Sequence, residues 1–137
     1  MPYLLDTNVV SEPYKPSPDR GVIAWLGRRT TAELFISAVT IGEVRRGIAR
    51  LQLRNDHRQA DRYEAWLTTV KDSFGHRIVD VTTEIAERWG SDDARRPVPT
   101  ADGLIAATAA VRDWTLVTRN VKDFEPTGVR LLNPFTG

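Results

Sequence analysis

Short apolar runs alternate with amphipathic stretches of helical periodicity along the whole sequence, and this alternation limits the folds open to the chain. A short apolar run followed by a helix-length segment is typical of βαβ units, whose strands pair in parallel. The sequence therefore predicts an α/β fold with three layers, in which helices flank a mainly parallel sheet of about five short strands. The predicted strands are Tyr3–Leu5, Leu34–Ile36, Ile78–Val81, Thr115–Thr118 and Val129–Leu132.

The predicted helices carry apolar residues at helical spacing, and a proline-rich loop at Pro13–Pro18 separates the first strand from the first of them. Thr40 and Glu43 fit a capping box at the start of the second helix. The predicted helices begin at Asp19 (Val22, Ile23 and Leu26 inward), Thr40 (Ile41, Val44, Ile48 and Leu51), Arg58 (Ala60, Tyr63, Leu67, Val70 and Phe74), Thr83 and Ala101. Four tryptophans fall on these apolar stripes or at helix ends, where we expect packing: Trp25, Trp66, Trp89 and Trp114.

Length and charge exclude several classes of protein. A chain of 137 residues predicts one domain, residues 1–137. Its 19 Lys and Arg residues against 18 Asp and Glu give a net charge of +1, which excludes a nucleic-acid clamp that acts by bulk positive charge.

The composition also narrows the chemistry and the compartment. Cysteine is absent and only His57 and His76 are present, so neither a disulfide framework nor a zinc site built from Cys and His is expected. No apolar run approaches the length of a membrane span, and the first residues do not form a signal peptide. We therefore expect a cytoplasmic protein without membrane contact.

Four acidic residues fall where this sheet would bring them to one edge, because ligands of parallel sheets bind at the carboxyl ends of the strands. Carboxylates a few ångströms apart raise one another's pKa, so such a cluster needs a cation to stay ionised. Oxygen ligands without Cys or His favour Mg²⁺ or Mn²⁺, and a hard cation held by carboxylates suits phosphoryl chemistry. The four are Asp6 at the end of the first strand, Glu43 and Asp102 in the first turns of helices, and Asp123 after the fourth strand.

Each acid also has a purely structural explanation. Glu43 fits the last position of the capping box, and Asp102 complements a helix dipole. Asp123 fits a turn, and Asp6 would cap the residues that follow it. A charged group that ends a buried strand is costly without a partner, so Asp6 is the hardest of the four to explain by structure alone.

Four sequence blocks around these acids follow one another in a recognisable order. They are Leu4-Leu5-Asp6-Thr7-Asn8, Ser37–Glu43, Ala101–Ala109 and Leu116–Phe124. In this order and at these separations they resemble the PIN domain, specifically the VapC-type toxin ribonucleases of bacterial toxin–antitoxin pairs. The resemblance covers residues 3 to 134.

This resemblance implies a PIN-like fold and a Mg²⁺-dependent endoribonuclease, with Mn²⁺ as a substitute, that hydrolyses RNA phosphodiester bonds with metal-activated water. The four acids Asp6, Glu43, Asp102 and Asp123 map onto the family's active-site acids, with Asp6 and Asp102 as magnesium ligands. We expect Asp123 to share the cation environment and Glu43 to position or deprotonate the attacking water. The polar residues that map onto positions orienting the acids or the water are Thr7, Asn8, Thr118 and Asn120.

The resemblance also implies partners: a homodimer, and a larger assembly with a cognate antitoxin that blocks the acidic pocket. The amphipathic stretch Ile41–Phe74 offers apolar surface for a partner helix. Of the 19 basic residues 16 are arginine, and Arg46, Arg50, Arg54, Arg58 and Arg62 repeat every four residues. Arg46 and Arg50 are candidate contacts to RNA or to a partner, and the alternative for the whole stripe is a solvated helix face.

Two other functions fit the acids. The first is a phosphotransferase that uses Asp6 as a covalent nucleophile, although haloacid-dehalogenase-like phosphatases have a second aspartate where this sequence has Asn8. The second is a non-catalytic module that binds RNA or protein and holds a structural cation with its acids.

Overall fold

A five-stranded parallel sheet forms the centre of the computed structural model, which describes residues 1–136. Its strand order is β3-β2-β1-β4-β5, and every neighbouring pair is parallel. The α/β class predicted from the sequence is confirmed. The strands are β1 (Tyr3–Leu5), β2 (Leu34–Ser37), β3 (Ile78–Val79), β4 (Thr115–Val117) and β5 (Leu131–Leu132).

The outer strands β3 and β5 are shorter than the sequence predicts. β3 ends at Val79 because Asp80 and Val81 are exposed and Thr82 already caps the next helix, accepting a hydrogen bond from the amide of Ile85. β5 begins only at Leu131, since Gly128 has a positive φ of 74° that ends the preceding turn.

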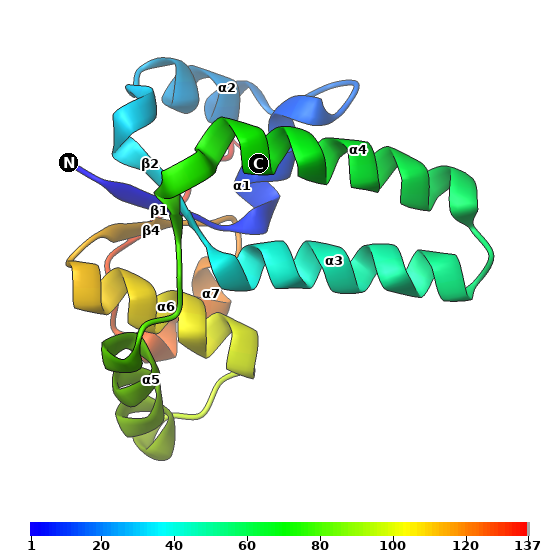
Figure 1. Cartoon of the computed structure of the whole chain (residues 1–137). Coiled ribbons are helices and arrows are strands. Elements are labelled where there is room, and N and C mark those ends of the chain that lie inside the picture. The colour runs from blue at the N-terminus through cyan, green and yellow to red at the C-terminus, as the bar shows by residue number, and fades with distance from the viewer. Residues whose placement is uncertain (137) are drawn as a thin grey trace.

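Helices cover both faces of the sheet (Figure 1), as the apolar character of its strands requires. The helices are α1 (Thr7–Ser11), α2 (Arg20–Gly27), α3 (Ala38–Leu53), α4 (His57–Phe74), α5 (Thr83–Arg95), α6 (Thr100–Arg112) and α7 (Val121–Phe124), with 3₁₀ turns η1 (Glu12–Tyr14), η2 (Thr31–Glu33), η3 (Gly75–Arg77) and η4 (Glu125–Thr127). None of the helices in residues 1–136 has the length and apolar character needed to cross a membrane.

The central strand β1 divides the core between the two faces of the sheet. Leu5 packs with residues of α1, α2 and α4, whereas Leu4 packs with residues of α6 and α7. Successive side chains of a strand point to opposite faces, so this pair fixes which helices lie on which side. Both leucines are buried.

The predicted capping box at Thr40 is wrong. The helix begins at Ala38, and the hydroxyl of Ser37 caps it by accepting a hydrogen bond from the amide of Val39 at 3.0 Å. Thr40 is buried inside the helix, and its Oγ1 has no hydrogen-bond partner among residues 1–136. Glu43 is therefore not a capping residue, which removes its purely structural explanation.

The inner faces of two helices also differ from the prediction. In α2, Trp25 is buried beside Val22, whereas Ile23 is 43% exposed. In α4, Tyr63 is 45% exposed. Trp25 lies one turn from Val22 and joins the same core cluster, so the bulkier aromatic side chain takes the inward position.

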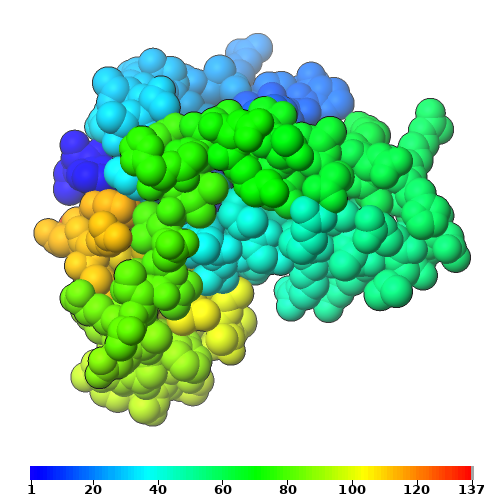
Figure 2. All heavy atoms as spheres, viewed as in Figure 1, coloured from blue at the N-terminus to red at the C-terminus, as the bar shows by residue number. Residues whose placement is uncertain are grey.

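Helices α3 and α4 form a long antiparallel hairpin that extends from the body of the molecule as an arm (Figures 1 and 2). Asn55 makes the turn with a positive φ of 61°. A small apolar cluster that includes Ile48 and Leu67 fills the interior of the hairpin. Arg45 on α3 and Glu64 on α4 add a two-pronged ion pair with N···O distances of 2.6 and 2.9 Å.

A buried arginine joins the end of α4 to the start of β2. The Arg77 guanidinium donates to the carbonyl oxygens of Thr31, Leu34 and Ser73 at 3.0, 2.6 and 2.6 Å. It also lies over the ring of Phe74. Because these contacts replace the water that a buried cation loses, Arg77 fixes the edge of the sheet against the hairpin.

Replacing Arg77 with methionine will lower the free energy of unfolding by about 2–4 kcal/mol, because three carbonyl oxygens lose their donor. Urea unfolding measures the effect. Arg58→Met, on the exposed surface of α4, is the matched control and is expected to change stability by less than about 0.5 kcal/mol. Equal stability of the two variants would contradict this role of Arg77.

Candidate active site

The sheet order makes the carboxyl end of β1 the place where the candidate site forms. The chain runs from β1 to β2 and β3 on one side of the sheet and then crosses to β4 on the other side of β1, so the strand order reverses beside β1. Ligands of parallel sheets bind at such a switch point. Asp6 follows β1 directly, and its amide continues the ladder by donating to the carbonyl of Val117 at 2.9 Å.

The Asp6 carboxylate is 7% exposed and is held by three donors. The amide of Thr7 donates to Oδ1 at 2.8 Å, which makes Asp6 the N-cap of α1. The hydroxyl of Thr118 donates to Oδ2 at 2.8 Å, and the side-chain amide of Asn8 donates to the same oxygen at 3.3 Å. Asp6 therefore caps α1, as the sequence suggested, and it also lines an acidic pocket.

Further hydrogen bonds hold the residues that orient Asp6. The amide of Asn120 donates to Thr118 Oγ1 at 3.0 Å, and the amide of Arg119 donates to Asn8 Oδ1 at 3.1 Å. Thr118 is fully buried. The segment after β4 and the start of α1 therefore fix each other through the side chains around Asp6.

An open pocket of about 440 Å³ brings three of the four predicted acids together: Asp6, Glu43 and Asp102. Asp6 comes from the end of β1, Glu43 from the second turn of α3 and Asp102 from the first turn of α6. The fourth acid, Asp123, is exposed on α7 and does not line the pocket, but its charge acts on Asp6 and Asp102.

Burial and mutual repulsion raise the pKa of each of these three carboxyl groups. For Asp6 burial is the main cause of the raised pKa, the hydrogen bonds it accepts act in the opposite direction, and the charge of Asp123 adds a small increase. For Glu43 burial raises the pKa first, followed by the charges of Asp6 and Asp102, while Arg46 opposes them. For Asp102 burial again comes first, then the charges of Asp6 and Asp123.

The donor set of this pocket fits a hard divalent cation. Within residues 1–136 no three Asp, Glu or His side chains approach closely enough to form a preassembled metal cage. Mg²⁺ does not need one, since it is bound through one or two carboxylates and keeps several of its waters. An open pocket of carboxylates with raised pKa, lined also by the polar side chains of Thr7, Asn8 and Asn120, has that character.

The other predicted site residues separate into two groups. Thr7, Asn8, Asn120 and Arg46 line the pocket with the acids. Thr118 does not line the pocket but donates a hydrogen bond to Asp6. Arg50 is exposed one turn further along α3 and does not line the pocket either.

Sequence reasoning missed Ser11, which lines the same pocket, and Glu12, which is 5% exposed. Ser11 lies four residues after Thr7 in α1, and this helical spacing was the available signal. Glu12 accepts from the amide of Asp19 at 2.9 Å and pairs with Lys15 at 3.0 Å, which holds the loop after α1. No pattern in the sequence indicated its burial.

The arginine stripe does not run along one helix face. Arg46 and Arg50 lie on α3, Arg54 caps its end, and Arg58 and Arg62 lie on the returning helix α4. The four-residue repeat therefore reverses direction at the hairpin turn, and only Arg46 of the five reaches the acidic pocket.

A second, largely apolar groove of about 540 Å³ adjoins the acidic pocket and shares Thr7, Ser11 and Val44 with it. It runs between the α3–α4 hairpin and the segment after α1. Aromatic side chains of Tyr14, Tyr63 and Trp66 line it, with Tyr14 and Trp66 edge to face at 6.0 Å between ring centroids. One side of the groove belongs to the stretch Ile41–Phe74 that the sequence indicated as a partner surface, and the other side comes from residues 7–16.

Comparison with known proteins places this chain in one family. Residues 3–127 match the PIN domain. The chain is 32% identical to the toxin FitB of Neisseria gonorrhoeae over 137 residues, covering 96% of this chain and 97% of FitB. It is 30% identical to the VapC ribonuclease Y4jK of Sinorhizobium fredii, with 96% of each chain covered.

A solved structure supports the same family assignment. A crystal structure of FitAcB from Neisseria gonorrhoeae superposes with a TM-score of 0.82 at 32% identity, covering 96% of this chain and 97% of that one. The chain therefore belongs to the PIN-domain family, and the resemblance drawn from its four sequence blocks is confirmed.

Lowering the pH of the metal-free protein from 7 to about 5 will raise its free energy of unfolding. A carboxyl group whose pKa is higher in the folded chain takes up its proton first in the folded state, so stability is gained as the pH falls toward the ordinary carboxyl range near about pH 4. At lower pH the gain reverses, because Glu12, Asp19 and Glu33 have lowered pKa values and lose their hydrogen-bonded charge. A stability maximum is therefore expected at mildly acidic pH.

Urea unfolding in EDTA across this pH range measures the effect. The double variant Glu43→Gln with Asp102→Asn provides the comparison, and its stability is expected to depend less steeply on pH between 5 and 7. Superimposable pH profiles for the two proteins would show that repulsion in the pocket does not limit stability.

Proposed function

We propose that this protein is the toxin of a toxin–antitoxin pair and an endoribonuclease that hydrolyses RNA phosphodiester bonds with the help of Mg²⁺. The observation that carries the proposal is the pocket in which Asp6, Glu43 and Asp102 meet at the carboxyl edge of the sheet with raised pKa values. Relatives named as a toxin and as a VapC ribonuclease, matched over nearly their whole length, support it.

Asp6 and Asp102 are the proposed ligands of the cation, which would polarise a phosphate oxygen and activate water when bound. Asp6 is suited to this because Thr7, Asn8 and Thr118 fix the orientation of both its oxygens. Asp102 lies in the first turn of α6, where the helix dipole favours its charge.

Glu43 is the proposed group that positions the attacking water and takes its proton. Burial and the charges of Asp6 and Asp102 raise its pKa, and a base with a raised pKa accepts a proton more readily near neutral pH. Arg46 lines the same pocket and contributes the positive charge that opposes this shift. Its guanidinium is the proposed contact for a phosphate of the RNA.

Purified protein will cut total cellular RNA into discrete fragments with Mg²⁺ or Mn²⁺ and not with EDTA. Asp6→Asn and Glu43→Gln will each lower the rate of cleavage at least about 100-fold. Each replaces one carboxylate of the acid cluster by an uncharged amide of similar size. Denaturing gels and sequencing of the fragment ends measure cleavage. The variants are the control, because a contaminating ribonuclease would cut equally well in all preparations.

The same variants separate the proposal from its alternatives. Circular dichroism and thermal unfolding establish whether Asp6→Asn and Asp102→Asn remain folded. Loss of cleavage by folded variants supports catalysis, whereas unfolding of both would indicate that the acids hold a structural cation. A phospho-aspartate trapped at Asp6 would overturn the hydrolase and support a phosphotransferase.

The proposed antitoxin binds the apolar groove beside the acidic pocket. Three aromatic side chains line this groove, among them Tyr63 at 45% exposure, and aromatic residues dominate the energy of protein interfaces. Because the groove and the acidic pocket share Thr7, Ser11 and Val44, a partner in the groove lies next to the acids and would cover them. This localisation rests on the proposed role as a toxin.

Tyr63→Ala will weaken binding of the cognate antitoxin at least about 30-fold, because a central aromatic contact is lost. Titration calorimetry with the product of the neighbouring gene measures the affinity. Thr69→Ala, exposed elsewhere on α4, is the control and should bind as tightly as the unmodified chain. If both variants bind equally well, the antitoxin does not use this groove.

A further inference from the structure

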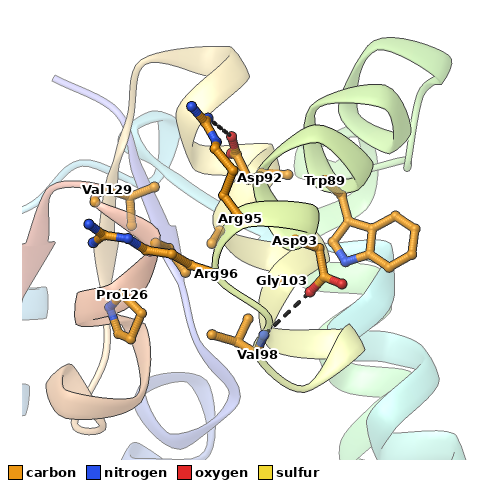
Figure 3. A pocket seen from close by; sticks show the side chains of 13 residues that line it. Trp89, Asp92, Asp93, Arg95, Arg96, Val98, Gly103, Pro126 and Val129 are labelled. Atoms are coloured by element: carbon orange, nitrogen blue, oxygen red, sulfur yellow. Dashed lines mark hydrogen bonds and ion pairs between the residues drawn. The ribbon is translucent and has the colours of Figure 1, made fainter.

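A separate pocket of about 300 Å³ lies between α5, α6 and the segment that follows α7 (Figure 3). Trp89 and Arg96 come from α5 and its end, Ala106 and Ala107 from α6, and Val129 from the chain leading to β5. Its volume is at the lower end of the range of about 300–1,000 Å³ for pockets that bind small ligands.

Part of the lining of this pocket is apolar. Ala106 and Ala107 are buried and form its floor with Val129. Trp89 packs so closely on α6 that a Cβ on Gly103 would lie 2.8 Å from its Cδ1, so glycine is required there. The indole Nε1 of Trp89 is a buried donor without a hydrogen-bond partner among residues 1–136.

Two arginines and two aspartates line this pocket, and Arg96 is the arginine without an ion-pair partner among residues 1–136. Asp92 is already paired with Arg88 at 2.9 Å and with Arg95 at 3.2 Å, and Asp93 accepts from the amide of Val98 at 3.3 Å. In the described part of the chain no acidic side chain lies within ion-pair distance of Arg96. Figure 3 shows its side chain extending toward Pro126 and Val129, opposite the indole of Trp89.

The pocket lies close to the acidic site along α6, which lines both. In α6, Asp102 lines the acidic pocket and the next residue, Gly103, lines this one. Asp123 acts on the pKa of Asp102 from α7, and Pro126, three residues later, lines this pocket. Asp102 and Gly103 are neighbours in α6, so the two pockets adjoin the same turn of this helix.

We propose that this pocket binds one nucleotide of the single-stranded RNA substrate, beside the bond that is cut. The base lies against the alanine floor and the wall formed by Trp89, and the Arg96 guanidinium stacks on the base or binds its phosphate through paired hydrogen bonds. The inference rests on the proposed nuclease function and extends it, since a nucleotide held here selects which bond reaches the acids.

Binding of RNA in EDTA tests the pocket independently of catalysis. The probe is a fluorescein-labelled single-stranded RNA of twelve nucleotides with all four bases at each position, measured by fluorescence anisotropy. Arg96→Lys keeps the charge but loses the planar guanidinium, and Val129→Phe fills the pocket without changing charge. Each is expected to weaken binding at least about tenfold.

The matched controls are Arg28→Lys, at the exposed end of α2, and Ile23→Phe, on the exposed face of the same helix, and both should bind RNA like the unmodified chain. Thermal unfolding verifies that all four variants are folded. Unchanged binding by folded Arg96→Lys and Val129→Phe overturns the inference, whether or not the unmodified protein cleaves RNA.

Cleavage of the same RNA pool with Mg²⁺ provides the second readout. The pocket variants are expected to raise KM and to broaden the distribution of bases next to the cut, with kcat changed less than about threefold. A protein that cleaves no RNA, yet loses RNA binding on Arg96→Lys and Val129→Phe, would refute the proposed nuclease function and leave the pocket as an RNA site. Cleavage with an unaltered base distribution in both variants would refute the pocket alone.

Discussion

The carboxylate of Asp6 ends the central strand in a position that is 7% exposed, and its need for hydrogen-bond donors organises the edge of the sheet around it. Thr7 and Asn8 supply donors from the start of α1, and Thr118 supplies one from the end of β4. The pairing of β1 with β4 brings these groups together, and the hydrogen bonds in turn hold the two strand ends in register. The pairing of β1 with β4 and the hydrogen bonding of the Asp6 carboxylate therefore depend on each other.

The arrangement that satisfies Asp6 leaves the acids around it repelling one another. Glu43 and Asp102 are brought to the same edge by helices that cover the sheet, and the charge of Asp6 raises the pKa of both carboxyl groups. Arg46 offsets this for Glu43 only in part. Such stored repulsion is typical of functional sites, where stability is given up for a local charge distribution. A bound cation would convert the repulsion into attraction.

The sequence was sufficient to predict the order of the five strands along the chain, because buried strands read as apolar runs. Three of the four acids that it indicated meet in one pocket, whereas Asp123 does not line it. The capping pattern predicted the wrong start for α3, because Ser37 and Thr40 are both residue types that cap helices. Glu43 fits a capping box with Thr40, whereas the helix is capped by Ser37. The exposure of Ile23 and the burial of Glu12 depend on contacts between distant elements. The pocket beside Trp89 was invisible for the same reason, since α5, α6 and the chain before β5 each supply one wall.

The hydrogen bond between Thr118 and Asp6 joins residues 112 positions apart. A growing chain leaves the ribosome N-terminus first, so β1 with Asp6 emerges long before its neighbour β4 has been made. During that interval the central strand has no partner on one side and the carboxylate lacks its buried donor. Synthesis itself thus delays assembly of the acidic edge until almost the entire chain is available.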